Sequence, residues 1–307
     1  MADLAFHTEF EPAHGRAVGV GDGILRVTAA NAGPFTFHGT NSYVVGGRSV
    51  AVIDPGPDDA DHLAALVAAI GGRPVSHILV THTHIDHSPL ARRLARITGA
   101  PLLGEGPHRA ARDLHLGEIN PLDASGDRDF EPDQALAHGE VVAGDGWALE
   151  AVHTPGHAAN HMCFALAGRD ILFSGDHVMA WSTSIVAPPD GSMADYMASL
   201  ETLLARAETT YLPGHGGRLD NARDFVRALR THRRMREAAI LGRIRAGDRT
   251  IARVVASIYR DTDPRLHGAA ALSVLAHVEE LLAAGRIASD GPPSLDASYE
   301  ATEPGAE

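Results

Sequence analysis

The chain has 307 residues, 44% of them hydrophobic and 21% charged, so it can bury at least one full hydrophobic core and is not disordered throughout. Its 26 basic residues are all Arg, and 39 acidic residues bring the formal net charge to −13. The length predicts about two domains. Two features need an explanation: the nineteen His residues, and a positive charge that guanidinium groups alone carry.

The single cysteine and the N-terminus indicate the compartment. Cys163 lies in the apolar stretch MCFAL and has no second cysteine with which to form an internal disulfide. The N-terminal stretch MADLAFHTEFEP contains acids and no Arg, unlike a secretory signal. No stretch approaches the roughly 18 to 20 apolar residues that a membrane span needs. We therefore expect a cytoplasmic protein without a membrane segment.

Strands and helices alternate in the first hundred residues. Helical spacing of apolar residues predicts helices over 58–70 and 90–98. Short apolar or alternating runs that end at Gly, Asn, Asp or Pro predict strands at 24–29, 35–47, 49–56 and 76–81. This order is typical of an α/β fold in which helices cover a sheet.

The stretch 105–140 breaks this pattern, because it holds several acids, three prolines and little periodicity. We expect a partly helical excursion there, of a length that suggests function or disorder. The pattern then resumes, with strands at 141–145, 147–154, 161–168 and 170–176, a helix over 193–207 and a strand at 209–214. Residues 1–217 therefore form one predicted α/β domain.

Composition changes after residue 217. Residues 218–260 contain twelve Arg and four acids, a local charge of +8, so the rest of the chain carries −21. A long helix over 221–246, inside a basic connecting segment 218–247, is predicted to start at Asn221 as N-cap. One face of that helix collects four cations, Arg223, Arg227, Arg230 and Arg234.

The C-terminal part has the pattern of a second, small domain. Two apolar helices, a Gly and a short strand within 248–290 predict a winged-helix-like unit. Residues 291–307 are rich in Pro and acids, so we expect a disordered tail there.

The strongest chemical signal is the stretch THTHIDH, which follows the apolar strand ILV. It places His82, His84, Asp86 and His87 within six positions of a strand end. Neutral imidazoles and carboxylates suit zinc and similar divalent ions. An extended His-X-His pair projects both rings the same way, whereas Asp86 and His87 lie further on and could reach a second ion.

Three more ligand-type residues lie at later strand ends: His157 in HTPGH, Asp176 in SGDH and His215 in YLPGH. All three can gather at one sheet edge with the first cluster. Five His and two Asp are too many for one tetrahedral zinc ion. They fit two ions that share a carboxylate and a solvent molecule.

These residues resemble the motif of the metallo-β-lactamase superfamily, His-X-His-X-Asp-His followed by separate His, Asp and His. The resemblance implies an αββα sandwich with two divalent ions, zinc first and iron or manganese as alternatives. It implies that Asp176 bridges the ions. It assigns one ion to His82, His84 and His157, and the other to Asp86, His87 and His215.

Longer stretches resemble one branch of this superfamily. GTNSYVV, FEPDQALAHGE, TPGHAANHMCFAL, DYMASLETLL and YLPGHGG, together with the basic helix and the winged-helix-like end, are similar to the beta-lactamase-like protein 2 family. Animal members of that family are single-strand-specific endoribonucleases, whereas bacterial relatives are usually named only as hydrolases. The resemblance therefore leaves the substrate open.

A binuclear site implies a mechanism and several accessory residues. Divalent ions lower the pKa of a bridging water toward about 7, and the hydroxide attacks a carbonyl carbon or a phosphorus. Asp86 could orient that hydroxide, and His161 or His177 could serve as proton donor or orient a metal ligand.

Three further interpretations each have an alternative. Asn41 lines the substrate cleft or is a turn residue; Trp181 walls the pocket or belongs to the core; His108 and His115 form a lid or are ordinary exposed residues.

Four functions compete. Hydrolysis of an ester, thioester or lactone is the first, with a small-molecule substrate. Cleavage of single-stranded RNA is the alternative, because the Arg-rich segment 218–260 could contact phosphates. A solvated helix face is the simpler interpretation of that segment. Aromatic residues, on which the bases of a single strand would stack, are only 5% of the chain. Weak β-lactamase activity comes next. A DNA-binding regulator that uses the winged helix, with the metal site as a ligand sensor, comes last. We expect the winged-helix-like unit to pack onto the cleft or to mediate a homodimer.

Overall fold

Residues 4–116, 118, 120, 123–260 and 263–302 are described by a computed structural model of the protein. A seven-stranded sheet forms the first half of the chain, and its strands lie in sequence order. The first four strands pair antiparallel, whereas β4 to β7 pair parallel. Its strands are β1 (Ala17–Gly21), β2 (Ile24–Thr28), β3 (Asn41–Val45), β4 (Val50–Ile53), β5 (Val75–Leu79), β6 (Leu102–Gly104) and β7 (Gln134–Ala135).

A second sheet of five strands packs against the first, in the order β12-β11-β10-β9-β8. Only β11 and β12 run parallel; the other pairs are antiparallel. Its strands are β8 (Val141–Gly144), β9 (Trp147–His153), β10 (Met162–Leu166), β11 (Ile171–Gly175) and β12 (Thr210–Pro213).

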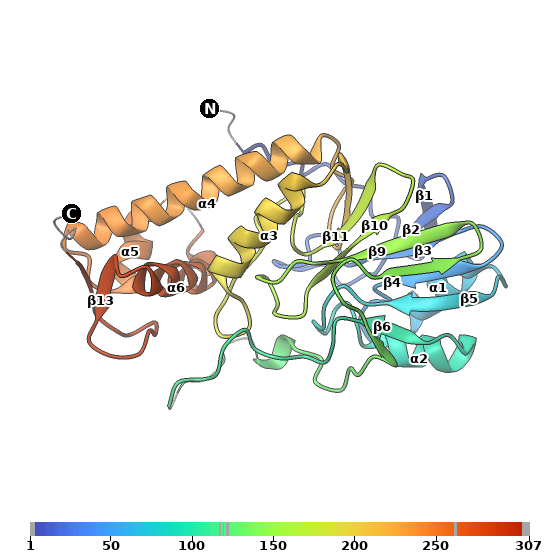
Figure 1. Ribbon diagram of the computed structural model, residues 1–307, viewed down its shortest axis with the longest axis horizontal. Helices are drawn as coiled ribbons and strands as arrows, with labels where there is room; N and C mark the ends of the chain where they lie inside the picture. The colour runs from blue at the N-terminus through green and yellow to red at the C-terminus, as the bar shows by residue number, and fades with distance from the viewer. Residues whose placement is uncertain (1–3, 117, 119, 121–122, 261–262, 303–307) are drawn as a thin grey trace.

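Helices cover the outer face of each sheet, which confirms the predicted αββα sandwich (Figure 1). Helices α1 (Ala60–Ile70) and α2 (Leu90–Thr98) pack on the first sheet. Helices α3 (Met193–Ala205) and α4 (Ala222–Arg245) pack on the second. The period-two alternation of the strands produces the layers: Val44 of β3 faces α1, while its neighbour Tyr43 faces the core between the sheets.

Helix α4 leaves the sandwich and carries the C-terminal domain (Figure 1). That domain holds α5 (Ile251–Ile258), a 3₁₀ turn at Pro264–Leu266, α6 (His267–Ala283), and the antiparallel pair β13 (Ile287–Ser289) and β14 (Tyr299–Ala301). Its own hydrophobic core joins the end of α4 to α5 and α6.

Three local predictions are wrong. In the stretch 35–47 only residues 41–45 form a strand, because a bridge between Gly33 and Phe37 closes a turn before it. In 105–140 the described residues hold only the 3₁₀ turn Asp123–Ser125 and β7, so the excursion has little helix. Asn221 occupies the N-cap position of α4 without capping it, because its backbone is left-handed (φ 56°) and its side chain makes no cap hydrogen bond.

The predicted disordered tail is also partly wrong. Residues 299–301 form β14, and the buried ring of Tyr299 joins the core of the C-terminal domain. The Tyr299 hydroxyl donates to the carbonyl of Ser294 at 2.5 Å. A single aromatic anchor therefore orders a stretch whose composition favours disorder. Residues 303–307 of the predicted tail lie outside the described residues.

One helix exceeds the apolar length expected from the sequence. The stretch Pro264–Ala283 is long and apolar enough, by length and composition alone, to cross a membrane. Alanines raise its hydropathy, and the side chains of Val274, Val278 and Leu281 lie in the core shared with α4 and α5. We therefore interpret α6 as a core helix of the C-terminal domain.

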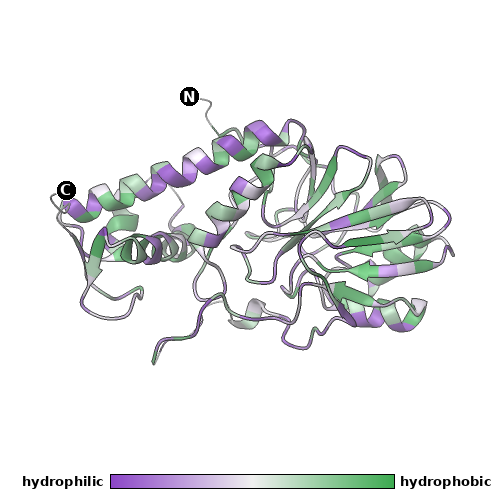
Figure 2. Ribbon diagram, viewed as in Figure 1, coloured by the Kyte–Doolittle hydropathy of each residue, from purple (hydrophilic) through white to green (hydrophobic). Residues whose placement is uncertain are grey.

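The four-Arg face of α4 is not a free basic surface. Arg230 and Arg234 both pair with Glu201 of α3, at 2.7 and 3.1 Å. Arg227 pairs with Asp224, and Arg223 donates to the carbonyl of Leu204. Figure 2 shows hydrophilic residues along the length of α4, and the two acids Glu201 and Asp224 offset two of the four positive charges on this face.

Candidate metal centre

The predicted ligands come together at one edge of the sandwich, where strands of both sheets end. Strand β5 leads into the THTHIDH loop, and strands β9, β11 and β12 are followed by His157, Asp176 and His215. Parallel pairing of β4 with β5 and of β11 with β12 brings their carboxyl ends to the same side. The arrangement depends on topology, because His82 and His215 are far apart in the chain.

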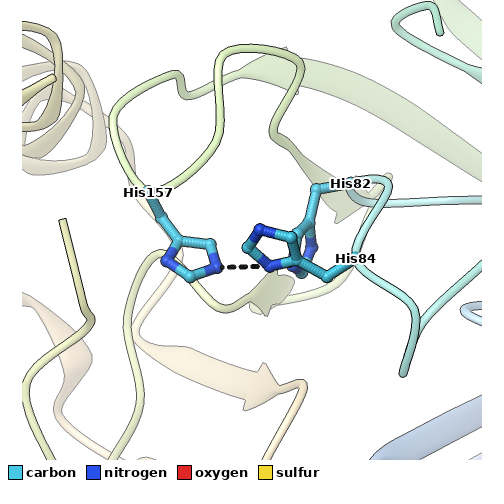
Figure 3. A group of neighbouring side chains, drawn as sticks. All are labelled: His82, His84 and His157. Atoms are coloured by element: carbon cyan, nitrogen blue, oxygen red, sulfur yellow. Dashed lines mark hydrogen bonds between the residues drawn. The ribbon is translucent and has the colours of Figure 1, made fainter. Parts of the chain in front are cut away.

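Three imidazoles form the first cluster (Figure 3). The Nδ1 atom of His84 lies 2.9 Å from Nε2 of His82 and 3.1 Å from Nε2 of His157. Burial, with further contributions from the neighbouring imidazoles, lowers the pKa of His84 to about 3 and also lowers those of His82 and His157. Three neutral rings therefore direct their nitrogens at one point, which is the arrangement that a divalent cation requires.

Asp86, His87 and His215 form the second cluster. The Oδ2 atom of Asp86 lies 3.3 Å from Nε2 of His87 and 3.2 Å from Nε2 of His215. Burial lowers the pKa of His215, but the carboxylates of Asp176 and Asp86 outweigh it and raise that pKa to about 9. The local potential therefore favours positive charge at this position, which a divalent cation would supply.

Asp176 lies between the two clusters. Its Oδ2 is 3.8 Å from Nε2 of His157 and 3.2 Å from Nε2 of His215, and its Oδ1 is 3.5 Å from Nε2 of His87. Oδ1 of Asp176 and Nε2 of His84 are buried without a hydrogen-bond partner. A carboxylate with an orphaned oxygen between two groups of ligands fits a bridging role, so the residues present fit two divalent ions.

The outer nitrogens of the ligands are held by a second ring of groups, as metal-binding His residues require. Nδ1 of His157 contacts the carbonyl of Ile185 at 2.6 Å, and Nδ1 of His215 contacts that of Gly39 at 3.2 Å. The hydroxyl of Thr40 donates to Asp86 at 3.0 Å. These contacts fix the orientation of the two rings and of the Asp86 carboxylate.

One functional residue was missed by the sequence analysis. Asp54, at the end of β4, lies 3.0 Å from Nδ1 of His87 and accepts hydrogen bonds from the backbone and hydroxyl of Thr81. It is 2% exposed and adopts a left-handed backbone (φ 48°). The sequence did contain a signal for this residue: Asp54 directly follows an apolar strand and precedes Pro-Gly. A carboxylate at such a position is seldom part of the hydrophobic core, so a functional role was the better prediction.

His161 does not occupy the position expected of a proton donor. It is fully buried, its Nδ1 contacts Thr154 Oγ1 at 2.9 Å, and its Nε2 accepts the backbone N–H of Asp176 at 3.1 Å. With both nitrogens engaged, the ring is a support for Asp176. The proposed catalytic role of His161 is therefore wrong, and the ligand-orienting alternative describes its geometry.

Asn41 does not line the cleft. Its side chain is completely buried, its Nδ2 donates to the carbonyls of Pro213 and Gly216, and its Oδ1 accepts from Thr28. The side-chain amide makes these three hydrogen bonds within the protein, so Asn41 joins β3 to the loop that carries His215. The substrate-binding assignment is therefore corrected to a structural one.

Trp181 is not a wall of the cavity beside the metal ligands either. Its ring stacks on Phe37 with centroids 4.8 Å apart and planes 9° from parallel. A side chain at Gly216 would also meet this indole. Trp181 thus holds the loops 33–39 and 213–217 together, next to the cavity but outside its lining.

The other candidate imidazoles do not reach the ligands. His177 is fully buried against Tyr196, with ring centroids 4.4 Å apart, and burial lowers its pKa to about 3. The side chain of His108 is also buried and lies 3.1 Å from the hydroxyl of Thr83, so it is not an exposed residue. His115 lines a separate cavity beside the C-terminal domain.

A cavity of about 330 Å³ opens directly on the metal ligands. Its charged or titratable lining groups are all predicted metal ligands: His84, Asp86, His157, Asp176 and His215. The remaining lining is largely apolar and comes from five segments of the chain, including α6: Phe35, Thr36, Ile85, Ser125, Met179, Ile185, Ala269 and Leu272. The C-terminal domain therefore contributes directly to the site.

Sequence relatives of the chain include fungal proteins. An atrochrysone carboxyl ACP thioesterase from Pseudocercospora fijiensis is 31% identical over 221 residues, which are 71% of this chain and 60% of that protein. The lactamase-like protein aptB from Emericella nidulans is 33% identical over 69% of this chain and 62% of its own length. The matched region thus spans less than two thirds of either relative.

Solved structures share the fold over more than nine tenths of the chain. A beta-lactamase domain protein from Burkholderia ambifaria matches with a TM-score of 0.79 at 22% identity and covers 95% of both chains. A metallo-beta-lactamase family protein from Thermus thermophilus matches with a TM-score of 0.72 at 23% identity, over 91% of this chain and 99% of the other.

Family descriptions match two parts of the chain. Residues 35–215 match the metallo-beta-lactamase superfamily, and residues 250–292 match the beta-lactamase-associated winged helix domain. The first match contains every residue of the two clusters, and the second contains α5, α6 and β13. Membership of the beta-lactamase-like protein 2 branch stays a prediction. The chain belongs to the metallo-beta-lactamase superfamily and carries the winged helix domain associated with it.

Proposed function

We propose that this protein is a binuclear metal-dependent hydrolase that cleaves thioesters with an apolar acyl group. The apolar cavity that opens on the metal ligands carries this proposal. The names of the fungal thioesterase relatives support the choice of bond.

Two zinc ions would occupy the two clusters, because His and carboxylate side chains are suitable ligands for zinc. His82, His84 and His157 would hold one, Asp86, His87 and His215 the other, and Asp176 would contact both. When bound, such ions supply Lewis acidity and a nucleophile at neutral pH. Iron or manganese could serve the same ligands.

The residues of the chain bind and orient the substrate around those ions. Phe35, Ile85 and Leu272 offer apolar surface to the acyl group, while the ligand edge of the cavity faces the carbonyl carbon. Phe35 and Ile85 are half exposed, at 53% and 49%, so an acyl group would remove their surface from water. Burial of that surface would place the thioester against the metal ligands.

The electrostatics favour this substrate class over RNA. The described lining of the cavity contains no Arg that could pair with the phosphates of an RNA strand on either side of the scissile bond. Arg230 and Arg234, two cations of the four-Arg face of α4, both pair with Glu201. RNA cleavage therefore becomes an outcome of the functional test.

The test compares purified, metal-loaded protein on four substrate sets: acyl thioesters of increasing acyl size on coenzyme A and on carrier protein, lactones, a β-lactam and single-stranded RNA. We expect thioester hydrolysis to exceed the others by at least about 100-fold in kcat/KM. RNA cleavage that falls when Arg227 and Arg230 are both changed to Glu, with little thioester hydrolysis, would refute the proposal.

Leu272 provides a separate prediction about acyl size. It lines both the cavity at the metal ligands and the neighbouring cavity of about 450 Å³, which His115, Pro188 and Leu295 also line. Leu272→Ala should connect the two spaces and raise kcat/KM for long acyl thioesters about tenfold relative to short ones. The same preference profile in the variant and in wild type would show that Leu272 does not limit the acyl group. Leu282→Ala, in the same helix but facing the domain core, is the control for general loosening of α6.

A further inference from the structure

A second group of metal-ligating side chains lies outside the active site, where α4 meets α6 in the C-terminal domain. Glu237 of α4 and His277 and Glu280 of α6 place one ligand atom each within 4.8 Å of the others. His277 and Glu280 are three residues apart on one helix, so they face the same side. None of the three lines the cavity at the metal ligands.

Three buried polar atoms at this place have no hydrogen-bond partner: Nδ1 and Nε2 of His277 and Oε2 of Glu280. The His277 side chain is 3% exposed. Its Nδ1 is 3.9 Å from Oε2 of Glu280, which is too far for a direct hydrogen bond. Buried polar atoms normally have a hydrogen-bond partner, so three unpaired atoms at one place point to a bound species there.

We propose that Glu237, His277 and Glu280 bind a structural zinc ion that joins α4 to α6. One imidazole and two carboxylates are a zinc ligand set, and a water molecule would complete a tetrahedron. Ligand atoms on one zinc ion lie about 3.4 Å apart when each is about 2.1 Å from the metal. The side chains therefore need to move inward by about 1 Å or less.

The protonation states fit this role. Burial, with help from Arg233 and His232, lowers the pKa of His277 to about 3, so the ring is neutral and can ligate. Burial and the neighbouring Glu237 raise the pKa of Glu280, as expected for two carboxylates that lack a cation between them. Arg286 pairs with Oε1 of Glu237 at 2.6 Å and orients that carboxylate.

Nearby cations would oppose a divalent ion, but other groups hold them. Arg233 donates to the carbonyl of Ser184, and its guanidinium lies over the ring of Tyr196. Arg236 lies over the ring of Tyr259 at 4.8 Å. The two carboxylates thus face the proposed ion while both guanidinium groups are anchored elsewhere.

Zinc stoichiometry of the full chain tests the proposal independently of the catalytic function. In a variant with His84→Ala and Asp176→Ala, which disables the main centre, we expect about one zinc ion per chain to remain after dialysis. Adding Glu280→Gln should remove it, whereas adding His232→Leu, a neighbouring His outside the group, should not. Cobalt loaded in place of zinc should show a visible d–d spectrum in the first protein that disappears with Glu280→Gln.

The wild-type background gives a second measurement if the double variant does not fold. There, Glu280→Gln should lower the zinc count by one ion per chain and keep the rate of thioester hydrolysis within about twofold of wild type. It should also abolish the increase in the melting temperature of the C-terminal domain that added zinc produces in wild type. Equal zinc counts in Glu280→Gln and wild type would overturn the proposal and leave a buried water as the partner of His277 and Glu280.

Discussion

Replacing Asp176 by Ala should abolish turnover and release metal. The carboxylate lies between the two clusters, within 3.2 to 3.8 Å of His87, His157 and His215, and its Oδ1 has no other partner. Loss of groups that merely orient a ligand costs roughly 10- to 100-fold in metal affinity, so loss of a ligand common to both ions should exceed about 100-fold. Elemental analysis after dialysis and kcat on the best thioester measure both effects.

Asp170→Ala is the matched control for this prediction, because that Asp stands just before the same strand and binds Thr209 at the opposite end. It should keep wild-type metal content. An Asp176→Ala protein that retained two ions per chain and normal turnover would show that Asp176 does not bridge.

Gly214→Ala should damage the centre almost as severely, although it removes no ligand. A Cβ atom at this position would lie 2.7 Å from Cε1 of His87 and closer still to Oδ1 of Asp176. Real Cβ atoms almost never approach so closely, so either the carboxylate or the ring must move. Displacement of reacting groups by about 1 Å can cost roughly 100-fold in rate, and we expect at least that loss in kcat together with lower zinc affinity.

Gly217→Ala separates this steric effect from a general effect of Ala in the loop. Its Cβ would meet only Phe10 and Glu9 at 3.6 and 3.8 Å, which are ordinary contacts. Circular dichroism and the melting temperature should show both variants folded. Full metal occupancy and rate in Gly214→Ala would mean that the ligands lie differently from the arrangement described.

The pattern of the sequence predicted the parts of the protein that depend on near neighbours. The helix over 90–98 was predicted at its observed bounds, and the α/β order followed from short runs of apolar residues. The seven ligand-type residues were recognisable because each stands just past an apolar strand, where side chains leave the core. Whether each one binds metal stays a prediction, which the Asp176 and zinc experiments address.

Contacts between distant parts of the chain could not be deduced from such patterns. Asp54 reaches His87 across 33 positions, and Asn41 reaches Pro213 across 172, so neither role has a local signature. The same is true of His161, whose partner is the backbone of Asp176, and of Trp181, which stacks on Phe37. For these residues the role depends on the partner, which the residue type alone does not reveal.

The sequence alone thus determined the fold class and the set of metal-ligand candidates, because periodicity and motif spacing act over a few residues. Only the tertiary structure showed which acids pair with the Arg residues of α4 and which cavity the C-terminal domain lines. The −13 net charge and the +8 segment suggested a separate basic surface, yet Arg230 and Arg234 of α4 share an ion pair with Glu201 of α3, which offsets one of their two charges. Leu272 of the winged helix domain likewise reaches the cavity at the predicted metal ligands, since packing of α6 against the sandwich brings a residue far beyond His215 in the chain to its lining.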